Sequence, residues 1–248
     1  MNDNAKREIL TRATAAHARA LGELDAEPGA VGRPKIRRMA DRIEHTLLGS
    51  GAAAADLERL LDEALEHRFR AVCVLPRDVE RAAARLEGSG VIPVTVVDFP
   101  LAGGTRAAVA AETGAVVGAG AAEVDMVVDV RALRAGELER VRDGVRGVVD
   151  AARGAPVKVI LETGLLDAEQ IAAGCAAAEA GGARYVKTST GFGPRGASVE
   201  DVAVMRACVA ERLGVKASGG IRTAAAAREL AAAGADLIGT SAGPVCVG

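Results

Sequence analysis

Short apolar runs rich in β-branched residues recur along most of this 248-residue chain, and a segment of helical character follows each run. Neighbouring runs are roughly 22 to 33 residues apart, the length of one strand–helix–strand unit. The runs are continuously apolar rather than alternating, as in parallel strands that helices cover. The sequence predicts strands at residues 42–48, 70–74, 91–97, 123–128, 157–161, 184–188, 214–217 and 236–240.

The number of predicted strands favours a closed (β/α)₈ TIM barrel, because eight strands with their helices occupy about 250 residues. An open doubly wound sheet is the alternative that the pattern leaves open. Predicted helices at 53–67 and 224–233 fit either architecture, as does one at 198–213 that Ser198 would cap.

Residues 1–40 precede the first predicted strand and contain one amphipathic segment followed by a Gly/Pro/Arg-rich linker. We therefore divide the chain into an N-terminal helical extension and linker (1–40) and a barrel domain (41–248). The extension is expected to pack against the barrel or a neighbouring molecule. Barrels of this kind often associate, so a homo-oligomer is an open expectation.

Composition excludes several classes of partner. The formal net charge is −2, aromatic residues make up 2% of the chain and Trp is absent, so binding to nucleic acid is not expected. No apolar run reaches the roughly 18 residues that a membrane span needs. The four cysteines are far apart and form no CxxC pair, which favours reduced thiols and a cytoplasmic location.

Polar side chains at the carboxyl ends of barrel strands indicate chemistry, and two lysines stand there. Lys187 lies in RYVKTSTGFG and Lys216 in GVKASGGIRT, on neighbouring predicted strands. Two ammonium groups in a poorly solvated pocket lower each other's pKa, which frees an amine to attack a carbonyl. The alternative is that such a lysine faces outward and packs against a helix.

Asp125 lies inside the apolar run EVDMVV, where a carboxylate needs a partner such as Lys216 to stay ionised. A buried ion pair without a catalytic role is the alternative.

Three loops that follow predicted strands suit a phosphate group, because glycines expose backbone N–H groups and hydroxyls add donors. They contain Thr190, Gly191 and Gly193; Ser218, Gly219 and Gly220; and Gly239, Thr240 and Ser241.

Other nucleophiles and metal ligands are scarce. Cys73, in AVCVLP, is expected to be a core residue near the pocket rather than a nucleophile, because no histidine has a complementary position. His45 is expected to line the mouth of the barrel. Three histidines and four dispersed cysteines do not make a zinc site, so no metal is expected.

These motifs resemble those of the deoxyribose-phosphate aldolase family. IEHTLL, AVCVLP, EVDMVVDVRALRAG, VKVILETGLL, YVKTSTGFG, VKASGGIRT and IGTSAG match in order and spacing, from about residue 41 to the carboxyl terminus. KTSTGFG and KASGGIRT are the most specific.

The resemblance implies that Lys187 forms the Schiff base, that Lys216 lowers its pKa, and that Asp125 with Lys216 relays protons. Substrate contacts are expected from Glu44, Thr46, Cys73, Lys158 and Thr190. The phosphate is expected among Gly191, Ser218, Gly219, Gly220, Gly239, Thr240 and Ser241.

The implied reaction is the reversible cleavage of 2-deoxy-D-ribose 5-phosphate to D-glyceraldehyde 3-phosphate and acetaldehyde, with no cofactor. Some positions depart from the family pattern: Glu44 replaces an Asp, and Asp98 and Ala102 are unusual in VDFPLAGG. No Tyr follows Tyr185, whereas some members end in a Tyr that assists proton transfer, so proton exchange is expected to depend on Asp125, Lys216 and water.

Three other functions stay open. They are a lysine-dependent barrel aldolase for another phosphorylated sugar, an imine-free phosphate-binding barrel isomerase or synthase, and a sugar-phosphate-binding module without catalysis.

Overall fold

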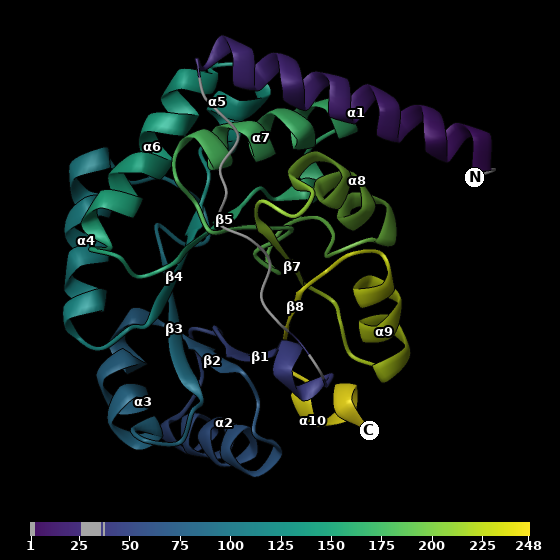
Figure 1. Cartoon of the computed structure of the whole chain (residues 1–248). Helices are drawn as coiled ribbons and strands as arrows, with labels where there is room; N and C mark the ends of the chain where they lie inside the picture. Colours follow the sequence, from purple (N-terminus) through teal and green to yellow (C-terminus); the bar gives the residue numbers. More distant parts are fainter. Residues whose placement is uncertain (1–2, 26–35, 37) are drawn as a thin grey trace.

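The computed structural model describes residues 3–25, 36 and 38–248, and its centre is a closed barrel of eight parallel strands. The strands follow one another around the barrel in chain order, and β1 closes it by pairing with β8, with Ile43 opposite Ile238. Figure 1 looks along the barrel, with the helices arranged around the strands. The strands are β1 (Ile43–Leu47), β2 (Ala71–Val74), β3 (Ile92–Val97), β4 (Glu123–Val127), β5 (Val157–Ile160), β6 (Tyr185–Lys187), β7 (Gly214–Ser218) and β8 (Leu237–Thr240).

The predicted barrel is confirmed, and the closure excludes the open doubly wound sheet. Each predicted strand matches an observed one to within one residue at either end. The helices are α1 (Asp3–Glu23), α2 (Ala54–His67), α3 (Val79–Leu86), α4 (Arg106–Gly118), α5 (Val130–Arg134), α6 (Leu138–Ala151), α7 (Ala168–Ala180), α8 (Val199–Val209), α9 (Ala224–Ala232) and α10 (Gly243–Val247). Three short 3₁₀ turns are η1 (Ala40–Arg42), η2 (Pro76–Asp78) and η3 (Thr163–Leu165).

One predicted helix is too long. The Ser198 side chain caps α8 as expected, accepting the Asp201 N–H at 3.1 Å, but α8 ends at Val209 rather than at residue 213. The next residue, Ala210, has a φ of 47°, which helical backbone does not adopt. The turn there leads the chain into β7.

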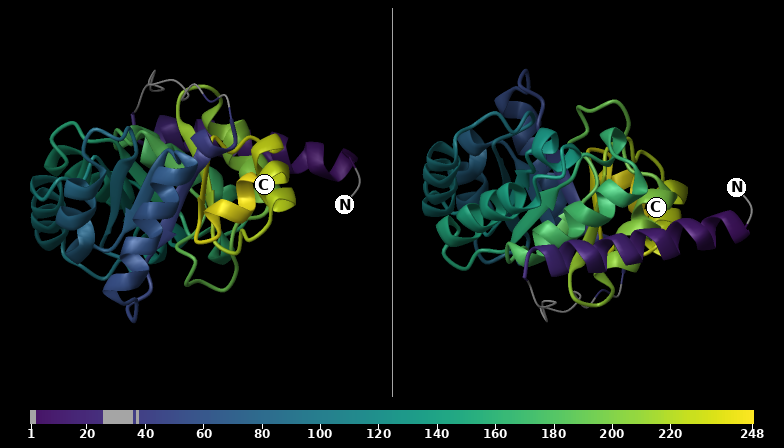
Figure 2. Two further views of the ribbon diagram at one scale, coloured as in Figure 1. Left: turned by 90° about the horizontal axis from the view of Figure 1, so that it is seen from below. Right: turned by 90° about the horizontal axis from the view of Figure 1, so that it is seen from above.

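The N-terminal helix α1 packs on the outside of α7 and α8, while its first turns extend beyond the barrel (Figure 2). Ala13, Ala16 and Ala20 are buried in the same hydrophobic cluster as the barrel core. His17 Nε2 lies 3.1 Å from Glu179 Oε2 of α7, which adds a buried polar contact. The predicted extension therefore packs against the barrel; its linker lies largely outside the described residues, and the division at residue 40 stays a prediction.

Inside the barrel, the two-residue period of each strand decides which side chains meet. Glu123 and Asp125 of β4 point inward together, as do Tyr185 and Lys187 of β6. Gly214 of β7 faces Tyr185, and a Cβ at Gly214 would lie 2.1 Å from the Tyr185 ring. Glycine thus makes room for the only aromatic side chain among these inward residues.

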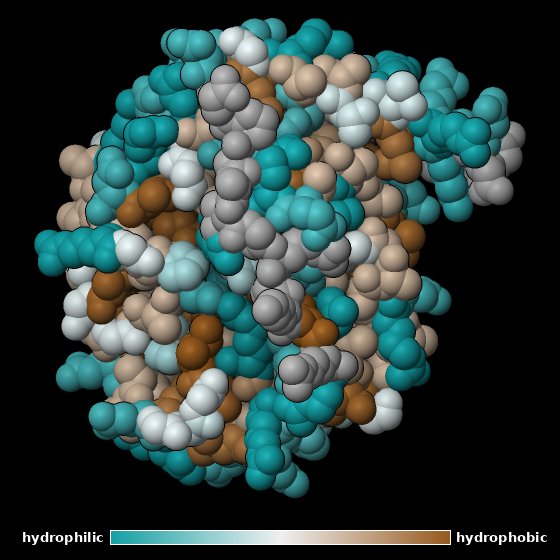
Figure 3. Space-filling view, in the orientation of Figure 1, coloured by the Kyte–Doolittle hydropathy of each residue, from teal (hydrophilic) through white to brown (hydrophobic). Residues whose placement is uncertain are grey.

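The surface seen in Figure 3 carries small hydrophobic groups scattered among hydrophilic residues. Among the described residues, no helix is long and apolar enough to cross a membrane.

Candidate active site

A buried cluster of amines surrounds Asp125 in the interior of the barrel. Lys158 Nζ and Lys187 Nζ each lie 2.8 Å from a carboxylate oxygen of Asp125, and Lys216 Nζ lies at 2.6 Å. Lys187 and Lys216 stand directly opposite each other on β6 and β7. The structure thus brings the three residues predicted to be catalytic together, and adds Lys158.

Two further charged residues, Arg70 and Glu123, extend this cluster, and the sequence analysis missed them. Arg70 precedes β2; its Nη1 donates to Glu44 at 2.6 Å and to Glu123 at 3.1 Å. Lys158 Nζ lies 2.6 Å from Glu123. Glu123 could have been found, because it is two residues before Asp125 and so shares its face of β4.

The electrostatics distinguish Lys187 from the other lysines. Burial lowers the pKa of Lys187, and Lys216 lowers it further, while Asp125 opposes both effects. Burial acts in the same direction on Lys158 and Lys216, but Asp125 and Glu44 outweigh it and raise the pKa of both residues. Lys187 is therefore the amine that loses its proton most readily.

The carboxylates stay ionised despite burial. Burial alone would raise the pKa of Glu44, but Lys158, Lys216 and Arg70 lower it to about 2. Burial would likewise raise the pKa of Asp125, and the three surrounding lysines hold it well below the ordinary value. Three carboxyl groups thus face four basic side chains in one cluster.

A pocket of about 230 Å³ opens above Lys187 at the carboxyl ends of the strands. Its wall includes Lys187, Thr46, Thr190 and all seven residues predicted to bind phosphate: Gly191, Ser218, Gly219, Gly220, Gly239, Thr240 and Ser241. The wall also includes residues that sequence reasoning missed: Leu48, Gly49, Phe192, Ile221 and Arg222. Arg222 follows the Gly219–Gly220 pair by two residues, a spacing that could have marked it as a cation beside a phosphate loop.

Hydrogen bonds fix the loop after β6. Glu162 accepts the Thr190 hydroxyl at 2.5 Å, and Thr190 Oγ1 accepts the Phe192 N–H at 3.0 Å. Gly191 between them has a φ of 88°, in the left-handed region that favours glycine. These contacts hold Thr190 and Gly191 on the pocket wall next to Lys187 of β6.

The loop after β7 lies against the loop after β6. Ala197 N–H donates to Ser218 O at 3.1 Å, and a Cβ at Gly196 would lie 2.0 Å from Gly219 O. Gly239 of β8 is close to Lys216, because a Cβ there would lie 3.0 Å from Lys216 Cε. Glycine at these positions allows the loops and the lysine to approach closely.

The remaining predicted residues lie below the pocket rather than on its wall. Asp125, Lys216, Glu44 and Lys158 belong to the buried charge cluster, where the Lys158 ammonium faces three carboxylates. Cys73 is fully buried, and burial raises the pKa of its thiol to about 11. A thiol in this state is a poor nucleophile, in agreement with its expected role as a core residue.

The prediction that His45 lines the mouth is wrong. Its Nε2 lies 2.6 Å from Glu63 of α2, and its ring meets Phe69 edge-on at 5.4 Å, so it faces the helix layer. Successive residues of a strand point to opposite faces, and Glu44 and Thr46 on either side of His45 point inward.

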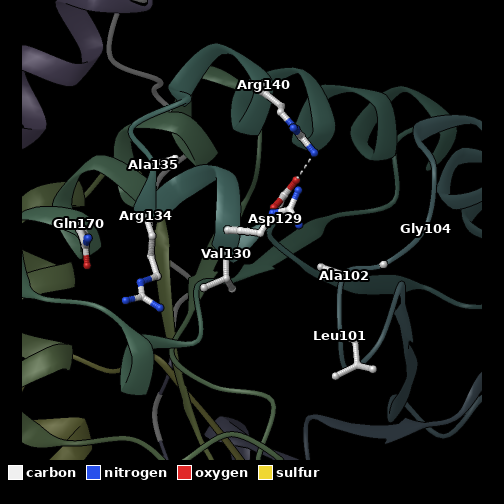
Figure 4. Close-up of a pocket in the computed structure, with 11 residues that line it drawn as sticks. Leu101, Ala102, Gly104, Asp129, Val130, Arg134, Ala135, Arg140 and Gln170 are labelled. Atoms are coloured by element: carbon white, nitrogen blue, oxygen red, sulfur yellow. Dashed lines mark ion pairs between the residues drawn. The ribbon is translucent and has the colours of Figure 1, made fainter.

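A larger hollow of about 830 Å³ lies beside the loops after β3 and β4, away from the lysines (Figure 4). Asp129 caps α5 and pairs with Arg140 at 2.8 Å, and in Figure 4 Arg134 and Gln170 lie to the left of this pair while Leu101 lies to its right. It contains none of the buried amines, so the smaller pocket is the candidate active site. Within the described residues, no group of three or more His, Cys, Asp or Glu side chains could hold a metal ion.

The chain is similar to known aldolases over most of its length. A family model described as DeoC/LacD family aldolase matches residues 39–246. A deoxyribose-phosphate aldolase from Acholeplasma laidlawii is 46% identical over 201 residues, covering 81% of this chain and 90% of the relative. One from a Thermotoga species is 47% identical over 208 residues, covering 84% of each chain. The tetrameric deoxyribose phosphate aldolase from Aeropyrum pernix superimposes with a TM-score of 0.79 at 31% identity, covering 97% of this chain and 96% of that one.

Proposed function

The chain belongs to the DeoC/LacD family of aldolases, and from this premise we propose that it cleaves 2-deoxy-D-ribose 5-phosphate reversibly through a Schiff base on Lys187. The products are D-glyceraldehyde 3-phosphate and acetaldehyde. The observation that carries the proposal is the buried pair of Lys187 and Lys216 on Asp125, beneath a pocket lined with glycine loops.

The first step needs an uncharged amine. Burial and the Lys216 charge both lower the pKa of Lys187, which increases the fraction of neutral amine near pH 7. The nitrogen attacks C1 of the open-chain sugar, and loss of water from the carbinolamine gives the iminium ion. Asp125 is hydrogen-bonded to both lysines and is placed to pass protons between them.

The iminium ion then accepts the electrons of the bond that breaks. When the proton leaves the C3 hydroxyl, the C2–C3 bond cleaves and C3 to C5 depart as D-glyceraldehyde 3-phosphate. C1 and C2 remain on Lys187 as an enamine. Protonation of the enamine at C2 and addition of water release acetaldehyde and the free amine. Lys216, Asp125 and water exchange the protons in this scheme.

The phosphate group is proposed to bind where the loops after β6, β7 and β8 meet. Backbone N–H groups of Gly191, Gly219 and Gly220 and the Ser241 hydroxyl can approach an anion closely there. Arg222 adds a positive charge at the same wall. Thr46 and Thr190 are proposed to contact the sugar hydroxyls.

The Schiff base is tested by trapping. The protein is incubated with acetaldehyde and sodium borohydride, digested and analysed by mass spectrometry, alongside a cleavage assay with deoxyribose 5-phosphate. The expected result is an ethyl group on Lys187 that is lost, together with turnover, in Lys187→Ala. A folded protein that turns over the substrate without an adduct at Lys187 refutes the imine mechanism and favours the imine-free barrel enzyme.

Two further proposals concern the setting of the enzyme. All four cysteines are free thiols, which fits the reducing cytoplasm as its location. We also propose a homo-oligomer, supported by the tetramer of the similar Aeropyrum pernix protein. Light scattering of the purified protein measures its mass in solution and tests this directly.

A further inference from the structure

Arg70 and Glu123 lie at the deep end of the charge cluster, and the proposed reaction makes no use of them. The Arg70 guanidinium contacts both Glu44 and Glu123, and its Cζ lies 6.0 Å from the centre of the Tyr185 ring. Glu123 is 5% exposed, and its second cationic partner is Lys158. Burying this many charges costs desolvation free energy that apolar side chains of similar volume would avoid. The network therefore points to a role beyond stability.

We propose that Arg70 and Glu123 are positioning residues that determine which buried lysine is uncharged, so that the free amine resides on Lys187. This inference rests on the assignment of Lys187 as the Schiff-base lysine. Neither residue lines the pocket, so both act through the groups that they contact.

The contacts show how the selection works. Glu44 is shared, with one oxygen on Arg70 and the other on Lys216. Glu123 is shared in the same way between Arg70 and Lys158. Lys158 and Lys216 therefore each face at least two carboxylates, whereas within the described part of the chain Lys187 contacts the Asp125 carboxylate alone. The lysine with the fewest anionic partners is the one that can lose its proton at least cost.

The charge balance points to the same lysine. Glu44, Glu123 and Asp125 carry three negative charges, and Arg70, Lys158 and Lys216 carry three positive charges. The cluster is thus neutral when Lys187 is uncharged, and protonation of Lys187 leaves one unbalanced buried positive charge. Arg70 supplies the third cation, because a guanidinium stays charged at any accessible pH.

The other ionisable groups near Lys187 lie outside this cluster of ion pairs, and Glu162, which follows β5, accepts the Thr190 hydroxyl instead. Cys73 of β2 and Tyr185 of β6 are neutral at pH 7, since burial raises the pKa of both residues. β3 and β8 contain no ionisable residue. Arg222 stands at the pocket wall, where a bound phosphate would neutralise it.

The test uses the acidic limb of the pH profile of kcat/KM for deoxyribose 5-phosphate cleavage, which reports the pKa of the free amine. Arg70→Met removes a positive charge from the cluster, so Lys187 should keep its proton to higher pH and the limb should move up by about one unit. Glu123→Gln should move the limb down. Arg70→Lys should restore the wild-type profile, and the double variant Arg70→Met/Glu123→Gln should lie near it.

Trapping with acetaldehyde and cyanoborohydride over the same pH range measures Lys187 directly in each variant. Opposite shifts in Arg70→Met and Glu123→Gln support the inference, and Glu123→Gln alone suffices if Arg70→Met does not fold. An adduct on wild-type Lys187 with unshifted profiles in the folded variants overturns the positioning role and leaves the proposed function intact. A wild-type protein that forms no adduct overturns both.

Discussion

Replacement by methionine, which nearly preserves the shape of the side chain, should lower the free energy of unfolding strongly at Lys158 but hardly at Lys187. Lys158 faces three carboxylates, at 2.6 Å from Glu123, 2.8 Å from Asp125 and 3.5 Å from Glu44. Lys158→Met leaves the buried Asp125 Oδ1 without a donor and removes a positive charge that faces three carboxylates, a change that costs about 3–5 kcal/mol. In a domain of this size, that loss lowers Tm by about 10 °C.

Lys187→Met should cost much less. Asp125 keeps Lys158 and Lys216 as donors, and the substitution removes an amine whose pKa burial already lowers. The expected change in the free energy of unfolding is within about 1 kcal/mol of zero, while turnover should fall by at least about 10³-fold because the nucleophile is gone.

Urea unfolding at pH 7.5, followed by circular dichroism, measures both variants against the wild-type protein. The reasoning fails if Lys187→Met is as unstable as Lys158→Met, or if Lys158→Met unfolds at the wild-type urea concentration. Either result would mean that the number of carboxylate partners does not set the cost of losing each lysine.

Three other predictions concern acid stability, the phosphate and the barrel interior. Below about pH 4.5 the free energy of unfolding should fall, because Glu44 takes up a proton near its ordinary pKa of 4.5 in the unfolded chain, whereas the folded protein holds that pKa at about 2. Constant stability in urea titrations between pH 6 and 3 would contradict this. Arg222→Ala should raise KM for deoxyribose 5-phosphate by about 10- to 100-fold but leave KM for unphosphorylated deoxyribose unchanged. Equal effects on both substrates would show that Arg222 does not bind the phosphate group. Gly214→Ala should cost about 1–3 kcal/mol, because the new methyl group overlaps the Tyr185 ring; an unchanged Tm in a thermal melt would show that the ring has room to move.

Much of the architecture could be predicted from the sequence because parallel strands leave a local signal. Each strand is a short apolar run, and each run was located to within one residue. Lys187, Lys216 and Asp125 stood out for the same reason, since a charge inside an apolar strand is conspicuous. The error at the end of α8 arose where helical propensity continues through Ala210 but the backbone turns to start β7.

The orientation of some side chains was also within reach of the sequence. His45 faces the helices because its neighbours Glu44 and Thr46 face the barrel interior. Glu123 points inward because it lies two residues before Asp125 on the same strand. Both follow from strand geometry alone, given one residue whose direction is known.

The charge cluster itself was decided by the tertiary structure. Glu44 and Lys216 are 172 residues apart in the chain, and Glu44 and Arg70 are 26 apart, yet they touch in the closed barrel. Closure brings β1 beside β8 and lets charged side chains from β1, β4, β5, β6 and β7 meet Arg70 in one interior, and no local pattern records which charges then become partners. The sequence thus determined the strands and their candidate amines, whereas only the fold decided how many carboxylates each amine meets in the buried interior, the number on which the proposed choice of Lys187 rests.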